Sequence, residues 1–94
     1  MEDNTLYFNP RICVIGLGYV GLPLARLFST KYRTVGFDLN QARVDELMSG
    51  TDSTLEVAND LLQSAIEMGK EYTDKGLVCT TDIEEIRNCN FYIV

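Results

Sequence analysis

The 94-residue sequence contains no histidine and no tryptophan, and its three cysteines are Cys13, Cys79 and Cys89. No Cys-x-x-C pair is present, so the chain offers too few ligands for a zinc site and we expect no metal. Cys13 and Cys79 fall inside predicted strands, where a free thiol behaves as a small buried hydrophobe.

Positive charge is also scarce, because eight Lys and Arg stand against 14 Asp and Glu and the net charge is −6. This balance argues against nucleic acid or an anionic membrane surface as a partner. No apolar run approaches the roughly 20 residues that span a bilayer. The acidic start, Met1–Asn4, is not followed by the apolar core of a signal peptide, so we expect a cytoplasmic protein. A phosphate ligand remains compatible with this charge, because backbone N–H groups can bind one.

The length allows one small domain, and 46% apolar with 23% charged residues is an ordinary globular composition. Residues 1–10 are expected to form an N-terminal lead-in, with Tyr7 and Phe8 covering an apolar edge. The domain itself is expected to comprise residues 11–94.

A strand, a glycine-rich turn and a helix follow one another near the start of this domain. Ile12–Ile15 is an apolar run of strand-forming residues, and Gly16, Gly18 and Gly21 follow it with the spacing G-x-G-x-x-G. Apolar residues then recur at helical spacing, which predicts a helix over about 19–31. In this context the glycine motif is a dinucleotide-binding fingerprint.

Each residue of the turn has a physical role in such a site. Gly16 allows the tight turn out of the strand, Gly18 lets a pyrophosphate approach the backbone, and Gly21 lets the helix lie close to the sheet. The N–H groups near Tyr19 and Val20 lack helical partners and are expected to point at the phosphates.

Two further residues are candidates for the adenosine end of the cofactor. Asp38 ends the strand predicted over Thr34–Phe37, 17 residues after Gly21, where a carboxylate can accept hydrogen bonds from ribose hydroxyls and repel the 2′-phosphate of NADP. The alternative is an acid that caps a helix. Arg43 lies in the first turn of a helix predicted over Gln41–Ser49, capped by Asn40. It could reach the ribose or the adenine, or it could be a solvated surface arginine.

Further helices and strands alternate along the rest of the chain. A helix starts either at a Ser53–Glu56 capping box or at Asn59, and ends at Gly69. The remaining expected elements are a strand over Leu77–Thr80, a short helix from Asp82 through Ile86, and a strand over Phe91–Val94. Such alternation predicts an α/β, Rossmann-like parallel sheet in the order 3-2-1-4, with helices on both faces and forming a partial domain.

Three stretches also resemble a known family. Ile15–Ala25, Val35–Leu47 and Gly50–Val57 are similar to the N-terminus of the UDP-glucose/GDP-mannose dehydrogenase family, and the resemblance runs from about residue 11 to the end. Within the family, Asp52–Val57 looks most like the UDP-N-acetylhexosamine 6-dehydrogenases of capsule, O-antigen and Vi-type polysaccharide synthesis.

The resemblance implies an NAD-dependent oxidation of a UDP-sugar C6 hydroxyl to a carboxylate, in a full-length protein that is a homo-oligomer. It implies that Val20 is a backbone donor to the pyrophosphate, that Asp38 binds the adenosine ribose, and that Arg43 lies at the same end of the cofactor. Glu56 matches a loop acid nearer the active site, although it also fits an acid at the start of a helix. The cofactor-binding residues are then Gly16, Gly18, Tyr19, Val20, Gly21, Asp38 and Arg43.

The family's thiol nucleophile, its lysine and its sugar contacts belong to later parts of the sequence. We therefore expect no catalytic residue here, and expect the 94-residue chain to be an inactive fragment that holds part of a cofactor site. Two other functions fit the glycines and Asp38. One is the NAD-binding part of a hydroxyacid or hydroxyacyl-CoA dehydrogenase, and the other is a non-enzymatic dinucleotide-sensing module.

Overall fold

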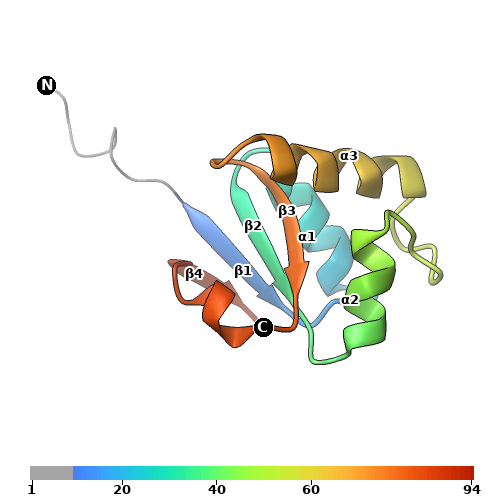
Figure 1. Ribbon diagram of the computed structural model, residues 1–94, viewed down its shortest axis with the longest axis horizontal. Coiled ribbons are helices and arrows are strands. Elements are labelled where there is room, and N and C mark those ends of the chain that lie inside the picture. The colour runs from blue at the N-terminus through green and yellow to red at the C-terminus, as the bar shows by residue number, and fades with distance from the viewer. Residues whose placement is uncertain (1–9) are drawn as a thin grey trace, which may run out of the picture.

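The computed structural model describes residues 10–94. The proposed roles of Tyr7 and Phe8 lie outside the described residues. Figure 1 shows the chain as alternating strands and helices, whose bounds are β1 (Arg11–Ile15), α1 (Gly21–Ser29), β2 (Arg33–Phe37), α2 (Gln41–Met48), α3 (Asn59–Glu71), β3 (Gly76–Thr80), the 3₁₀ helix η2 (Ile83–Ile86) and β4 (Phe91–Ile93). None of these helices is long and apolar enough to cross a membrane.

The four strands form one parallel sheet in the order β3-β2-β1-β4. Ile12 of β1 pairs with Thr34 of β2 on one side and with Phe91 of β4 on the other. The predicted strand order and the Rossmann-like arrangement are therefore confirmed. The order places β1 and β2 in the middle, and all their apolar residues except the half-buried Ile15 are buried, as expected for central parallel strands.

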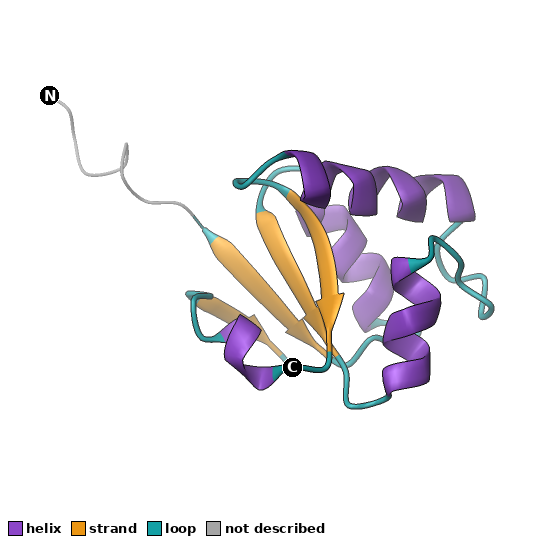
Figure 2. Cartoon of the chain, viewed as in Figure 1, coloured by secondary structure: helices purple, strands orange, loops and turns teal. Residues whose placement is uncertain are grey.

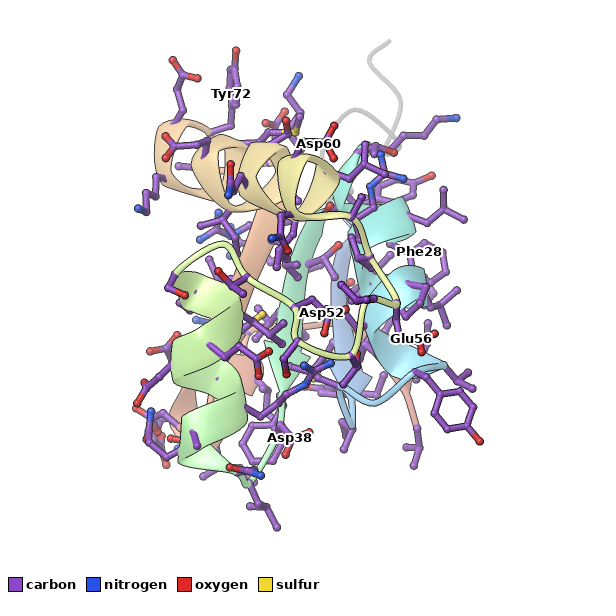
Figure 3. All side chains as sticks on the ribbon, turned by 90° about the vertical axis from the view of Figure 1, so that its right-hand side faces the viewer. Phe28, Asp38, Asp52, Glu56, Asp60 and Tyr72 are labelled. Atoms are coloured by element: carbon purple, nitrogen blue, oxygen red, sulfur yellow. The ribbon has the colours of Figure 1, made fainter. Side chains whose placement is uncertain are left out.

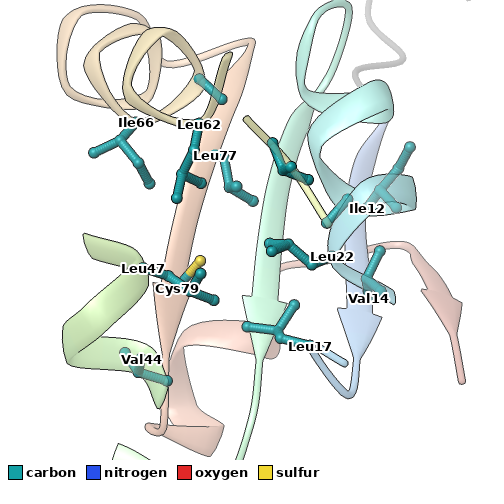
Figure 4. Packing of buried hydrophobic residues seen from close by; sticks show 13 residues of the cluster. Ile12, Val14, Leu17, Leu22, Val44, Leu47, Leu62, Ile66, Leu77 and Cys79 are labelled. Carbon is teal, nitrogen blue, oxygen red and sulfur yellow. The ribbon is translucent and has the colours of Figure 1, made fainter. Parts of the chain in front are cut away.

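The two faces of the sheet are covered unequally (Figure 2). The α-helices α1, α2 and α3 lie together on one face, over a core that includes Ile12, Val14 and Leu77 and is drawn in Figure 4. The opposite face carries a smaller cluster around Cys13 and Phe37, covered by η2. Both faces thus carry helical segments, as predicted, but the crossover to β4 contributes only a four-residue helix.

This asymmetry determines where a ligand can bind. From β1 the chain crosses to β2 through α1 on one face, whereas it reaches β4 through η2 on the other. The carboxyl ends of β1 and β4 therefore border the point where the connections diverge. In open parallel sheets this switch point leaves a crevice in which ligands bind.

The start of α3 agrees with the later of the two predicted starts, at Asn59, and not with the Ser53–Glu56 capping box. The helix begins at Asn59 with Ala58 as its N-cap and no side-chain cap, and it ends at Glu71 rather than at Gly69. Ser53 and Glu56 form no capping box, because Asp52 accepts the backbone N–H of Glu56 and holds the preceding segment in turns. Asn59 is already helical and accepts a hydrogen bond from the N–H of Asp52 instead.

Candidate functional site

The glycine turn leaves β1 in the conformation that its sequence requires. Gly16 has a φ of +96°, and its N–H donates to the carbonyl oxygen of Phe37 at 2.8 Å, which ties the turn to β2. A Cβ at Gly21 would lie 1.8 Å from the carbonyl oxygen of Gly16, so α1 can pack this closely only without a side chain there. Both observations confirm the roles predicted for these two glycines.

The turn between them presents donors without acceptors. Within the described part of the chain, the backbone N–H groups of Gly18, Tyr19 and Val20 donate to no other group. The residues Tyr19 and Val20 are 74% and 70% exposed, and a Cβ at Gly18 would meet nothing within 4 Å. The nine-residue α1 begins directly after these donors, so its dipole adds partial positive charge.

A hollow of about 350 Å³ lies at this end of the sheet. Its lining includes the two strands that flank the switch point, through Ile15 of β1 and Ile93 of β4. Five of the seven predicted cofactor residues line it, namely Gly16, Gly18, Tyr19, Val20 and Gly21. The hollow therefore lies where the fold predicts the crevice.

Asp38, the sixth predicted residue, follows β2 and accepts a hydrogen bond from the backbone of the glycine turn. Its Oδ2 accepts the N–H of Leu17 at 2.9 Å, and its Oδ1 accepts the N–H of Asn40 at 2.9 Å. A carboxylate has about four acceptor positions, so two remain for ribose hydroxyls. The alternative role of Asp38 as a cap is present in part, since it holds the backbone that enters α2.

Arg43, the seventh, is not a solvated surface arginine. Its side chain is only 12% exposed, its Nε donates to the carbonyl oxygen of Leu17 at 3.0 Å, and its Nη1 pairs with Asp52 Oδ1 at 2.8 Å. Burial opposes the charge, but the hydrogen bond and the charge of Asp52 raise the pKa of the guanidinium. Its Nη2 is buried without a hydrogen-bond partner in the described residues.

Asp52 is the functional candidate that the sequence analysis missed. Figure 3 shows it between α1 and α2, whereas Glu56 lies on the outer side of the same loop. The side chain of Asp52 is fully buried, whereas Glu56 is an exposed residue. The order Asp52-x-Thr54 is typical of a turn in which the aspartate accepts a backbone N–H two residues on, and it could have pointed to Asp52.

The cysteines play no part in this arrangement. All three are free and buried, as expected for Cys13 and Cys79. Burial raises the pKa of the Cys13 thiol to about 11 and that of Cys79 to about 12, so neither is a ready nucleophile. Across residues 10–94, no group of three or more acidic or cysteine side chains is placed to hold a metal ion.

These residues fit a dinucleotide. Three unpartnered N–H groups face an open hollow at a helix start, which suits a pyrophosphate. The carboxylate of Asp38 at the end of β2 has acceptor positions left for a ribose. Arg43, which like Asp38 is bonded to the backbone of Leu17, has an unsatisfied donor in its buried Nη2. A buried donor without a partner costs about 1–3 kcal/mol, which a ligand or a water molecule could offset.

Comparison with known proteins identifies relatives of the whole described segment. Residues 10–94 match the model of the UDP-glucose/GDP-mannose dehydrogenase family, NAD binding domain. The chain is 44% identical over 84 residues to UDP-N-acetyl-D-glucosamine 6-dehydrogenase from Salmonella typhi, and equally so to that from Pseudomonas aeruginosa. Each alignment covers 89% of this chain and 18% of the relative, so the chain spans about a fifth of the length of these proteins.

Solved structures agree with this relationship. UDP-D-ManNAc dehydrogenase from Pyrococcus horikoshii superposes with a TM-score of 0.73 at 29% identity, covering 87% of this chain and 19% of that one. A ternary complex of GDP-mannose dehydrogenase from Pseudomonas aeruginosa gives 0.64 at 28% identity, covering 80% and 16%. Both superpositions therefore show that this chain shares its fold with less than a fifth of each of these dehydrogenases.

Proposed function

The chain belongs to the UDP-glucose/GDP-mannose dehydrogenase family and forms part of its NAD-binding domain, and from this premise we propose that the whole protein oxidises a UDP-sugar at C6. The substrate class we propose is a UDP-N-acetylhexosamine. Its support is the 44% identity to two UDP-N-acetyl-D-glucosamine 6-dehydrogenases. Oxidation of a primary alcohol to a carboxylate removes four electrons, so two NAD molecules, each accepting one hydride, are reduced for every sugar.

The observation that carries this proposal is the row of unpartnered N–H groups at Gly18, Tyr19 and Val20. In the proposed site these donors hold the pyrophosphate, and the absence of a side chain at Gly18 leaves room for it. Asp38 receives the adenosine ribose, and Arg43 donates at the same end through Nη2. Gly16 and Gly21 shape the turn.

The described residues contribute binding rather than chemistry in this proposal. Their cysteines are buried with raised pKa values and they contain no histidine, so the nucleophile and the acid–base groups are assigned to other parts of the protein. We accordingly propose that the 94-residue chain alone is inactive. A cytoplasmic homo-oligomer that serves capsule or related polysaccharide synthesis is the biological setting that the family resemblance favours.

The test is an assay of the full-length protein with NAD and separate nucleotide sugars. We expect absorbance of the reduced cofactor to rise with UDP-N-acetylglucosamine or UDP-N-acetylmannosamine, to a limit of two reduced NAD per sugar. UDP-glucose and GDP-mannose are the matched alternative substrates, and Gly18→Val is the control for cofactor binding. Turnover confined to a 2-hydroxy acid or a hydroxyacyl-CoA, or no turnover with any sugar, would contradict the proposal.

A further inference from the structure

Asp52 is the most heavily bonded carboxylate among residues 10–94. Its side chain is fully buried, and its two oxygens accept five hydrogen bonds. The donors are Arg43 Nη1 at 2.8 Å, the N–H and the hydroxyl of Thr54 at 3.1 and 2.6 Å, and the N–H groups of Glu56 and Val57 at 2.9 and 3.0 Å. Burying a charge this completely is costly unless it is paired, so the contacts must hold it in one place.

The pairing continues from Asp52 to the glycine turn. Arg43 bonds to Asp52 through Nη1 and to the carbonyl oxygen of Leu17 through Nε, at 2.8 and 3.0 Å. The N–H of Leu17 is in turn bonded to Asp38. Leu17 stands between the first two glycines of the motif, and its own side chain is fully buried. Both backbone polar groups of this residue are therefore fixed by side chains from other elements.

We propose that Asp52 is a positioning residue for the dinucleotide, which acts through Arg43 on the backbone of Leu17 and so sets the direction of the N–H groups that follow. This inference rests on the proposed function, because it assigns those N–H groups to the pyrophosphate. Gly18, Tyr19 and Val20 donate to nothing in the described protein, so the held residue before them controls where they point. Donors fixed before binding lose less entropy on binding.

The charges around Arg43 explain why Asp52 rather than its neighbour has this role. Glu46 also approaches Arg43 Nη1, but at 3.4 Å and from a half-buried position, whereas Asp52 is fully buried. Burial by itself would raise the pKa of the Asp52 carboxyl, yet the hydrogen bonds from Thr54, Arg43 and Val57 bring that pKa well below its usual range. Asp52 is therefore ionised at neutral pH. Without Asp52, the Nη1 group of Arg43 keeps only the longer contact to Glu46, which draws the guanidinium away from its present position.

The first experiment measures NAD binding by calorimetry on the full-length protein. Asp52→Asn keeps the size of the side chain but removes its charge and one acceptor oxygen. We expect the dissociation constant for NAD to rise about tenfold, the lower end of what carboxylates that orient ligand-binding side chains contribute at metal sites. The kcat at saturating NAD should stay within about twofold, since only the starting position of the donors has changed. Asp45→Asn is the matched control and should leave both values unchanged, because Asp45 is an exposed acid on α2 whose side chain accepts a hydrogen bond from Gln41.

A double-mutant cycle shows whether the effect passes through Arg43. Arg43→Lys keeps a positive charge near Asp52, but a single ammonium cannot hold Asp52 and Leu17 together in the geometry of the guanidinium. In the Arg43→Lys background, Asp52→Asn should therefore change NAD affinity by less than about twofold, because the coupling has already been removed. If Asp52→Asn does not fold, Arg43→Lys alone tests the link, and unchanged NAD affinity in that variant overturns it.

A second readout needs no cofactor. Amide hydrogen exchange at Leu17 in the NAD-free protein should be faster in Asp52→Asn than in the unmodified protein, and unchanged in Asp45→Asn. Unchanged NAD affinity in Asp52→Asn, or an equal loss in both backgrounds of the cycle, overturns the inference and leaves the proposed function standing. Failure of the unmodified protein to bind NAD overturns the proposed function, and this inference falls with it.

Discussion

The proposed phosphate end of the site, at Gly18–Gly21, presents bare backbone, whereas the adenosine end presents side chains already bonded to one another. At the first, residues whose backbone N–H groups have no acceptor among the described residues line a hollow. At the second, Asp38, Arg43 and Asp52 are tied to each other through hydrogen bonds and the backbone of Leu17. The phosphate end depends on the shape of the main chain, and the adenosine end depends on a side-chain network that holds that shape.

Of the substitutions considered at the two ends of the site, a side chain at Gly21 should have the largest effect on folding. We expect Gly21→Ala to destabilise the chain by about 3 kcal/mol or more, because the new Cβ would lie 1.8 Å from the carbonyl oxygen of Gly16 and the backbone must move. Urea denaturation followed by circular dichroism measures the loss. Gly18→Ala is the control, because a Cβ at Gly18 would meet no atom within 4 Å. Its free energy of unfolding should change by no more than about 0.5 kcal/mol. Equal stability of the two variants would show that α1 does not need this close approach.

The next largest effect is expected at Gly18, where a substitution should abolish ligand binding without changing the stability of the fold. Gly18→Val should leave the unfolding transition nearly unchanged, because its Cβ meets nothing within 4 Å in the protein. NAD binding should be abolished, because the side chain occupies the space proposed for the pyrophosphate. Calorimetry with NAD and a denaturation curve on the same sample test both halves. Undiminished NAD affinity would mean that the phosphates bind elsewhere.

The phosphate end could be predicted from the sequence because its structure is local. Within Ile12–Ser29 a strand, three glycines and a helix follow one another. Each glycine is required by the local backbone conformation or by close packing within this segment, so distant residues do not alter the prediction. Parallel pairing followed equally from the alternation of strands and helices. The helix bounds were less accurate, since the end of a helix depends on competing caps.

The adenosine end could be predicted only in part. Asp38 was found because strand ends carry such acids, but its bond to Leu17 joins residues 21 positions apart. The sequence does not decide whether Arg43 contacts the ligand or is solvated, because its burial depends on Asp52, nine residues further on in an irregular loop. That loop was predicted as a possible helix start. Helix propensity alone cannot show that the buried carboxylate of Asp52 accepts hydrogen bonds from the N–H groups of Glu56 and Val57, which keeps this segment out of a helix.

A smaller effect is expected at Asp38. Asp38→Ala should weaken NAD by about 10- to 100-fold, because charge-assisted hydrogen bonds to the ribose are lost and the N–H of Leu17 loses its acceptor. The preference for NAD over NADP should narrow, since no carboxylate remains to repel a 2′-phosphate. Asp38→Asn retains one acceptor oxygen for Leu17 and separates the two contributions. Affinities for both cofactors decide the question, and a preference for NADP in the unmodified protein would refute the assignment.

The smallest effect concerns the stability of the network without ligand. The pKa of Asp52 in the folded protein lies below the ordinary value of 3.8, so the unfolded chain binds more protons as the pH falls toward that value. The stabilisation is therefore complete at neutral pH and is lost as the pH falls below about 4. Asp52→Asn cannot titrate. The difference in unfolding free energy between it and the unmodified protein should be about 1 to 2 kcal/mol at pH 7.

Acids that do not contact Arg43 are common to both proteins, so the change in this difference with pH reports Asp52 and its neighbour Glu46. Urea denaturation at pH 7 and pH 3 gives the two values, and the gap should be smaller at pH 3. Asp45→Asn, whose acid is exposed, should show almost no difference at either pH. A gap that stays constant between pH 7 and pH 3 would mean that packing, and not the charge of Asp52, holds Arg43 against the glycine turn, so that the two ends of the site are joined by shape alone.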